Sequence, residues 1–330
     1  MPPAVLRSTL LLCLASLGAA CAAAGAGQGR ARSDLGDAGA DGATRPWTPP
    51  DAGPRPDTGP RPDAGPAPGC TQVDLLFVVD NSPSMRPHQE ALAAAFPSFV
   101  DAMYDRLPPA VSLHVGVTTT SFYSGSCGES VINCVTSASD EEVRAHYVAP
   151  TDGSTGTNGE QGRLFEHAGR PFFEANTSDL DRGPLTEWFA GAAVAAGEGG
   201  CSFEMSSAAA GYAVHPANAA TNAGFVRDDD AVLVVFVLSD EPDKSPEGAG
   251  AYRDMLVGAK SACGGEACIM TAGLVNPCIR DVDNTLWQLL GAFGEAPVWG
   301  DIDDTDGYGD VVGDALARVV EQRCNEVVLY

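Results

Sequence analysis

Residues 80–84 place three oxygen-bearing side chains, Asp80, Ser82 and Ser84, on alternate positions directly after the apolar run 73–79. A carboxylate and two hydroxyls at the end of a strand can supply several ligands to Mg²⁺, which prefers oxygen ligands and keeps some of its waters. An open coordination position on such an ion can accept a carboxylate from a partner. Asp and Ser also favour turns and helix N-caps, so this segment alone is as compatible with a capping turn as with a metal site.

A second acidic segment, residues 239–243, follows the continuous apolar run 231–238, which predicts a strand buried on both faces. Strand-like and helix-like patterns alternate through residues 70–330. This order predicts an α/β fold of the Rossmann-like, doubly wound kind, with a mostly parallel central sheet and helices on both faces. Ligands bind outside the carboxyl ends of such strands. We therefore expect Asp240 to face Asp80 across a crevice if their strands are neighbours.

The elements that position these residues can be delimited from hydrophobic periodicity and from turn residues. Strands are expected at 73–80, 111–119, 171–175, 231–238, 268–275 and 297–299, and helices at 86–107, 184–195, 203–214, 246–262, 283–293 and 308–323. Residues 121–169 show little periodicity and are expected to form an irregular insertion, which is a candidate recognition surface. Residues 227–230, Arg-Asp-Asp-Asp, are expected to form a solvated turn before the long apolar strand.

Residues 1–20 are typical of an export signal, with Arg7, a short apolar core at 8–17 and small residues before Cys21. The core is too short to span a bilayer. Ending on Cys21, the region resembles a bacterial lipoprotein signal, in which this cysteine is lipidated and becomes the first mature residue. Ala22 then favours the outer membrane or cell surface. Simple cleavage, with a secreted or periplasmic product, is the alternative.

Residues 21–69 are expected to be a disordered tether, and residues 70–330 a globular domain. The tether is rich in Pro, Gly, Asp and Ala and contains a single aromatic residue, Trp47, so it cannot bury enough apolar surface to fold. The formal net charge of −25 argues against nucleic acid as a partner, and against any membrane contact beyond the lipid anchor. Cations and basic proteins are easier partners for such a chain.

Eight cysteines lie in the expected domain, and an even number in an exported chain predicts disulfides. They are Cys70, Cys127, Cys134, Cys201, Cys263, Cys268, Cys278 and Cys324. Short spacing favours local bridges from Cys127 to Cys134 and from Cys263 to Cys268. Cys70 and Cys324, at the two ends of the domain, could close it as a clasp, which would leave Cys201 with Cys278. Zinc is disfavoured because no paired C-x-x-C units occur.

Taken together, Asp80-x-Ser82-x-Ser84 after the first strand and Asp240 after the long apolar strand resemble the metal-ion-dependent adhesion site (MIDAS) of a von Willebrand factor A (VWA) domain. The whole layout resembles bacterial VWA-domain surface lipoproteins. The resemblance implies Mg²⁺, Mn²⁺ or Ca²⁺ on the hydroxyls of Ser82 and Ser84, with Asp80 and Asp240 direct or through water. It also implies a protein or peptide ligand whose carboxylate completes the shell. The family's mid-domain threonine has no counterpart here, and Ser202 or Glu204 could replace it.

Three classes of function follow from these observations. The leading one is a cell-envelope binding protein that engages a protein or peptide through the metal and is not an enzyme. A structural envelope protein with a degenerate metal site is the alternative, since the family threonine is missing. A Mg²⁺-dependent hydrolase is disfavoured, because Ser82 stands where phosphatases of the haloacid dehalogenase type carry an acid and no G-x-S-x-G elbow is present.

Overall fold

The computed structural model describes residues 70–123, 139–150, 156–227, 230–282, 284–294 and 296–324. The chain divides into two compact units, Met1–Pro60 and Arg61–Tyr330, and every described residue lies in the second. The predicted signal, Cys21 and the tether lie outside the described residues and stay predictions. No helix in the described part of the chain is long and apolar enough to cross a membrane.

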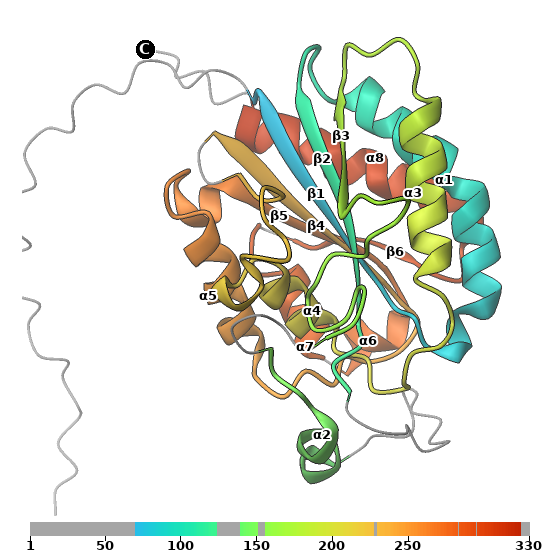
Figure 1. The fold of residues 1–330 in the computed structure, drawn as a ribbon, viewed down its shortest axis with the longest axis vertical. Coiled ribbons are helices and arrows are strands. Elements are labelled where there is room, and N and C mark those ends of the chain that lie inside the picture. Colours follow the sequence, from blue (N-terminus) through green and yellow to red (C-terminus); the bar gives the residue numbers. More distant parts are fainter. Residues whose placement is uncertain are drawn as a thin grey trace, which may run out of the picture. The chain divides into compact units, whose positions relative to one another are not determined.

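A six-stranded sheet forms the centre of the domain, in the order β3-β2-β1-β4-β5-β6 (Figure 1). Its strands are β1 (Gln72–Val79), β2 (Ser112–Thr119), β3 (Phe172–Asn176), β4 (Ala231–Ser239), β5 (Ile269–Val275) and β6 (Val298–Asp301). All neighbouring pairs are parallel except β2 with β3, which is antiparallel and lies at one edge. The doubly wound, mostly parallel fold predicted from the sequence is confirmed.

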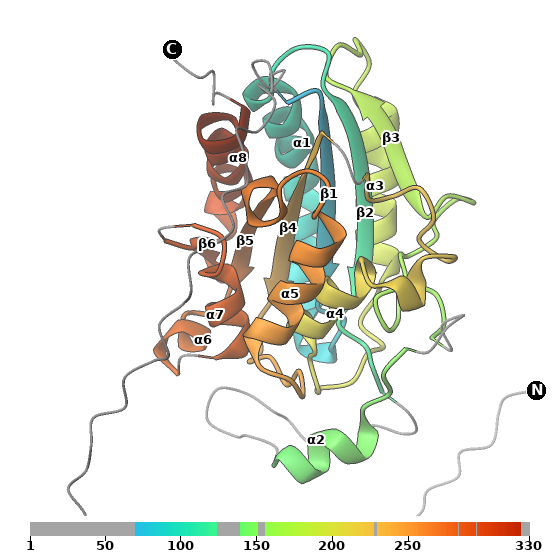
Figure 2. The same cartoon turned by 90° about the vertical axis from the view of Figure 1, so that its left-hand side faces the viewer.

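Helices cover both faces of this sheet (Figure 2). They are α1 (Arg86–Arg106), α2 (Asp140–His146), α3 (Gly183–Ala195), α4 (Ser206–Ala213), α5 (Ala249–Ala259), α6 (Pro277–Asp281), α7 (Thr285–Leu290) and α8 (Tyr308–Val319). Alternate residues of β1 point to opposite faces: Phe77 packs in a core with α1, α3 and α8, and Val78 in a second core with α4, α5 and α7. This arrangement explains why the central strands are apolar on every residue.

The predicted irregular insertion contains a short helix that periodicity missed. Helix α2 begins after Ser139, whose hydroxyl accepts a hydrogen bond from the backbone N–H of Glu142, while the Glu142 carboxylate accepts one from the backbone N–H of Ser139. This reciprocal pair is a capping box. The Ser-x-x-Glu pattern was therefore the signal for this helix, which is too short for periodicity to show.

Disulfides join the ends of the domain and staple the turn before β5. Cys70 is bonded to Cys324, and Cys263 to Cys268, so both of these predicted pairings are confirmed. Cys201 and Cys278 are disulfide-bonded as well, but their pairing with each other stays a prediction. The predicted bridge from Cys127 to Cys134 lies outside the described residues.

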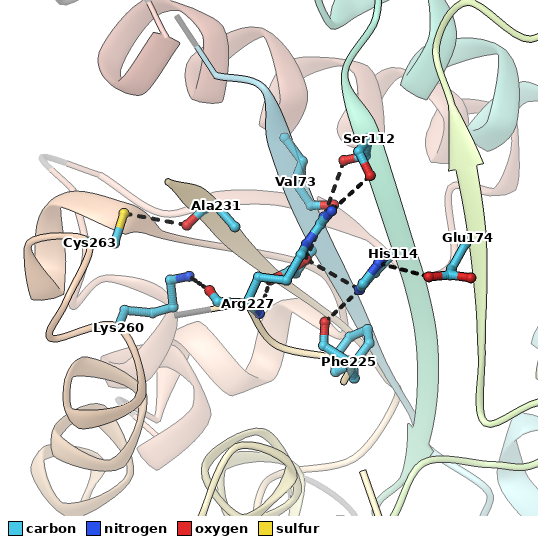
Figure 3. A network of polar contacts seen from close by, with 10 residues as sticks. Val73, Ser112, His114, Glu174, Phe225, Arg227, Ala231, Lys260 and Cys263 are labelled. Carbon is cyan, nitrogen blue, oxygen red and sulfur yellow. Dashed lines mark hydrogen bonds and ion pairs between the residues drawn. The ribbon is translucent and has the colours of Figure 1, made fainter. Parts of the chain in front are cut away.

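The expected solvated turn at 227–230 is wrong for Arg227, whose side chain points into the domain (Figure 3). Its Nε donates to Asp74 Oδ1 at 2.7 Å, and its backbone N–H donates to Asp74 Oδ2 at 2.8 Å. Asp74 is fully buried, and such a charge is stable in the interior only when it is paired and hydrogen-bonded. The buried Nζ of Lys260 donates to the backbone carbonyl of Arg227. These contacts fix the segment before β4 at the end of the sheet where β1 begins.

The Cys70–Cys324 bridge closes a loop of 254 residues in sequence separation, against 5 for Cys263–Cys268. Because a disulfide restricts the unfolded chain more when the closed loop is longer, replacing both cysteines of the long bridge by serine should lower the free energy of unfolding by about 2–5 kcal/mol. Urea unfolding of the full chain measures this value. The matched control is the Cys263→Ser, Cys268→Ser double variant, and a larger loss in this control would contradict the prediction.

Candidate metal centre

The two acidic segments meet at the carboxyl ends of two adjacent strands. Strand β1 pairs in parallel with β4, with Val79 beside Leu238, and the backbone N–H of Asp80 donates to the carbonyl of Leu238 at 2.9 Å. The chain leaves β1 toward β2 on one side, whereas β4 continues to β5 on the other. The condition that the sequence left open, that the two strands are neighbours, is therefore met, and the segments lie at the topological switch point of the sheet.

Asp80 is fully buried, and its carboxylate is held on two sides. The backbone N–H of Ser82 donates to Oδ1 at 2.8 Å, and the Ser239 hydroxyl donates to Oδ2 at 2.7 Å. The first bond closes a tight turn after β1, and the second joins the end of β1 to the end of β4. Asp80 therefore has a fixed orientation at the floor of the crevice.

The two serine hydroxyls connect this floor to the surface. Ser82 Oγ, which is buried, lies 2.7 Å from Oγ of the exposed Ser84. The Ser84 hydroxyl reaches Asp240 Oδ1 at 3.2 Å and Glu241 Oε1 at 3.3 Å. All four predicted ligands, Asp80, Ser82, Ser84 and Asp240, thus belong to one hydrogen-bonded cluster that opens to solvent at Ser84 and Asp240.

Glu204 completes the cluster from the segment before α4. Its side chain is 1% exposed; one carboxylate oxygen accepts a hydrogen bond from the Thr120 hydroxyl, and the negative charge of the nearby Asp80 raises the pKa of its carboxyl group. Its other oxygen, Oε1, is buried without a hydrogen-bond partner, and so is Oε2 of Glu241. Ser202, the other candidate for the missing threonine, makes no hydrogen bond to this cluster within the described part of the chain.

Burial raises the pKa of all four carboxyl groups, and the negative charge of Asp80 raises it further for the other three. Burial raises the pKa of Asp80, and the hydrogen bonds from Ser82 and Ser239 offset only part of this. Burial and then the negative charge of Asp80 raise the pKa of Asp240 to about 7. Burial, Asp80 and Asp240 together raise that of Glu241 to about 8. Burial and Asp80 raise the pKa of Glu204 well above its usual range.

The donor set fits a hard divalent cation. Two buried oxygens without hydrogen-bond partners lie among hydroxyls and carboxylates, and these are the ligand types that Mg²⁺, Mn²⁺ and Ca²⁺ prefer. No three or more Asp, Glu, His or Cys side chains in the described residues are arranged to hold a metal by themselves. A cation bound here would replace the protons that the crowded carboxylates otherwise retain.

A glycine lets a neighbouring loop clamp the turn after β1. The N–H of Gly200 donates to the carbonyl of Asn81 at 2.7 Å, and the Asn81 side-chain oxygen accepts a hydrogen bond from the Ser121 hydroxyl at 3.0 Å. A Cβ at position 200 would lie 2.4 Å from Asn81 Oδ1 and 2.7 Å from its carbonyl oxygen. Only glycine permits this approach without displacing the turn that carries Asp80 and Ser82.

Sequence reasoning found the four principal residues and offered Glu204 as one of two choices, but it missed the residues that hold them. Ser239, Thr120 and Glu241 all contact the cluster. Ser239 and Glu241 stand beside Asp240 in the segment that the sequence singled out, so that segment was their signal. Thr120 gave no signal, because its contact with Glu204 joins positions 84 residues apart.

Comparisons with known proteins add structural neighbours. No protein-family model and no curated protein matches the chain. Among solved structures, it is similar to a von Willebrand factor type A protein from Catenulispora acidiphila (14% identity, TM-score 0.38, covering 76% of this chain and 43% of that one). It is also similar to the pilus adhesin SpaC from Lactobacillus rhamnosus GG (12% identity, TM-score 0.38, 78% and 31%) and to proximal thread matrix protein 1 from the mussel byssus with a zinc-occupied MIDAS motif (11% identity, TM-score 0.37, 76% and 47%).

The structural neighbours are VWA-domain proteins. The chain spans less than half the length of each of these neighbours. The architecture of this chain is established by its own sheet order and covering helices. They form the mostly parallel, two-sided arrangement that the resemblance implied.

The clamp at Gly200 yields a prediction with a matched control. Gly200→Ala should displace the turn at Asn81 and lower the free energy of unfolding by about 1–3 kcal/mol. It should also reduce the rise in Tm that 5–10 mM Mg²⁺ produces, a concentration about five- to tenfold above a Kd of about 1 mM. Gly199→Ala meets no atom within 4 Å and should change stability by less than about 0.5 kcal/mol. Equal effects of the two substitutions, measured by thermal and urea unfolding, would show that the close approach is unimportant.

Proposed function

We propose that this protein is an envelope binding protein that holds a divalent cation at the end of β1 and β4 and engages a protein or peptide ligand there. Ser82 and Ser84 supply hydroxyl ligands, while Asp80, Asp240 and Glu204 supply carboxylates, direct or through water. The cation, Mg²⁺ or else Mn²⁺ or Ca²⁺, supplies a positive charge to which a carboxylate of the ligand binds. The observation that carries the proposal is the cluster of hydroxyls and carboxylates that opens to solvent at Ser84.

The main argument against a metal site is the missing family threonine, and Glu204 can take its place. A threonine hydroxyl would be a neutral donor, whereas Glu204 places a second buried carboxyl group beside Asp80 with one oxygen free of hydrogen bonds. A divalent cation offsets the repulsion between these two groups directly. The site is therefore altered relative to the resemblance rather than lost, which favours metal binding over the degenerate-site alternative.

Catalysis is not part of the proposal. The side chains next to Asp80 within the described residues are hydroxyls and carboxyls, and Ser82 is a buried hydroxyl bonded to Ser84 rather than to a base. A serine nucleophile needs a histidine or another base within hydrogen-bond reach. The arrangement supports a docking point on the cation.

The proposed location rests on the disulfides and on the export signal predicted from the sequence. The bonded pairs Cys70–Cys324 and Cys263–Cys268 are typical of an oxidising compartment. We extend the proposal to lipidation at Cys21 and to an outer-membrane or surface position, with residues 21–69 as the tether. The negative charge of the chain leaves the lipid as its membrane contact.

Binding should depend on the cation and on a carboxylate. A fluorescent hexapeptide of glycine and serine with one aspartate should bind the full chain in Mg²⁺. Its affinity, measured by fluorescence anisotropy, should weaken by about tenfold or more in EDTA. Asp80→Ala and Ser82→Ala should have the same effect while the fold, followed by circular dichroism, is kept. The control peptide carries asparagine in place of aspartate. Full binding in EDTA, or equal binding of the asparagine peptide, would contradict the proposal.

A further inference from the structure

A polar cavity of about 160 Å³ lies beside the metal centre. Its lining comes from α2, from the segment after β4 and from the start of α7: Asp140, Val143, Arg144, Asp243, Lys244, Ser245, Pro246 and Thr285. The backbone N–H of Lys244 donates to the carbonyl of Glu204 at 2.5 Å. The cavity wall is thus continuous with the segment that carries Asp240 and Glu241, and α2 lies at the same end of the sheet (Figure 2).

Lys244 contributes a positive charge to the lining of this cavity, near the carboxyl groups of Asp243 and Glu241. The chain has two lysines, Lys244 and Lys260, and Lys260 is buried with its Nζ on the carbonyl of Arg227. The half-buried Lys244 makes no side-chain hydrogen bond or ion pair within the described residues. The neighbouring carboxylate of Asp243 is already occupied, because it accepts hydrogen bonds from the backbone N–H groups of Ser207 and Ser245 and from the Ser245 hydroxyl.

Arg144 adds a second cation at the rim. Its Nη2 donates to the carbonyl of Pro246 at 2.9 Å, and its Nη1 lies 3.6 Å from a carboxylate oxygen of Glu247. The first contact holds the guanidinium at the cavity, and the second, between two exposed groups, is weak. Asp140 and Asp243 also line the cavity, and Asp140 and Arg144 are both exposed. In a chain of net charge −25, a cavity lined by as many cations as carboxyl groups departs from the general surface charge.

We propose that this cavity binds a second carboxylate of the same ligand, so that the ligand is an acidic peptide segment with two acidic side chains. This inference rests on the proposed function. The first carboxylate binds the cation at Ser84 and Asp240, and the second pairs with Lys244 and Arg144. The negative charge on the rest of the surface would repel such a ligand, so Lys244 and Arg144 determine where it binds.

The test compares the one-aspartate hexapeptide with three peptides that carry a second aspartate one, two or three positions later, all in Mg²⁺. At least one two-aspartate peptide should bind the full chain about three- to tenfold more tightly. Lys244→Met keeps the aliphatic stem and should abolish this advantage. The charge-matched control is Arg106→Gln at the far end of α1, about 30 Å along a helix of 21 residues, and it should keep the advantage.

A second readout does not depend on a variant. Acetylation of Lys244 by acetic anhydride, followed by mass spectrometry, should slow about threefold or more when the two-aspartate peptide binds, with buried Lys260 as the internal reference. Equal affinities of all peptides, an advantage that survives Lys244→Met, or unprotected Lys244 would overturn the inference and leave the proposed function intact. No binding of the one-aspartate peptide in Mg²⁺ would overturn both.

Discussion

The mutual repulsion of four carboxyl groups at the carboxyl ends of β1 and β4 is the constraint to which the surrounding structure responds. Asp80 and Glu204 are buried, and Asp240 and Glu241 lie beside them with pKa values raised to about 7 and 8. Such an arrangement is unfavourable for folding unless protons or cations balance the charge. Hydrogen bonds from the hydroxyls of Ser82, Ser84 and Ser239 offset only part of this repulsion. A divalent cation would offset it directly, and for this reason the crowding supports the proposed metal centre.

The rest of the domain holds this unfavourable site in place. The Arg227–Asp74 pair fixes the opposite end of the same strands, and the Cys70–Cys324 bridge ties the start of β1 to the helical turn that follows α8. On the site's own side, Gly200 clamps the turn at Asn81. Pre-organisation of this kind lowers the cost of bringing like charges together when the cation binds.

The sequence predicted the fold well because the fold depends on local patterns, such as the all-apolar run that identified β4 as a buried strand. Residues 80–84 and Asp240 lie together as expected, and their role as metal ligands stays a prediction. The predictions failed where contacts join distant segments or where patterns are short. Arg227 looked solvated because its partner, Asp74, lies 153 positions away. Helix α2 lacked periodicity, and the choice between Ser202 and Glu204 depended on which side chain reaches Asp80 in space. The position of Glu204, an acidic residue between Phe203 and Met205 just before a helix, was the sequence signal that favoured it.

Calorimetric titration of Mg²⁺ into the full chain, compared with Asp80→Ala and Glu204→Gln, tests the metal centre most directly. Wild type should bind saturably, with a rise in Tm, and Asp80→Ala should not. Glu204→Gln should bind about tenfold or more weakly, yet without metal it should be no less stable than wild type, because glutamine removes a carboxyl group whose charged form is disfavoured by burial and by Asp80. Absence of both heat and thermal shift in wild type, or equal binding by Asp80→Ala, would contradict the existence of the site.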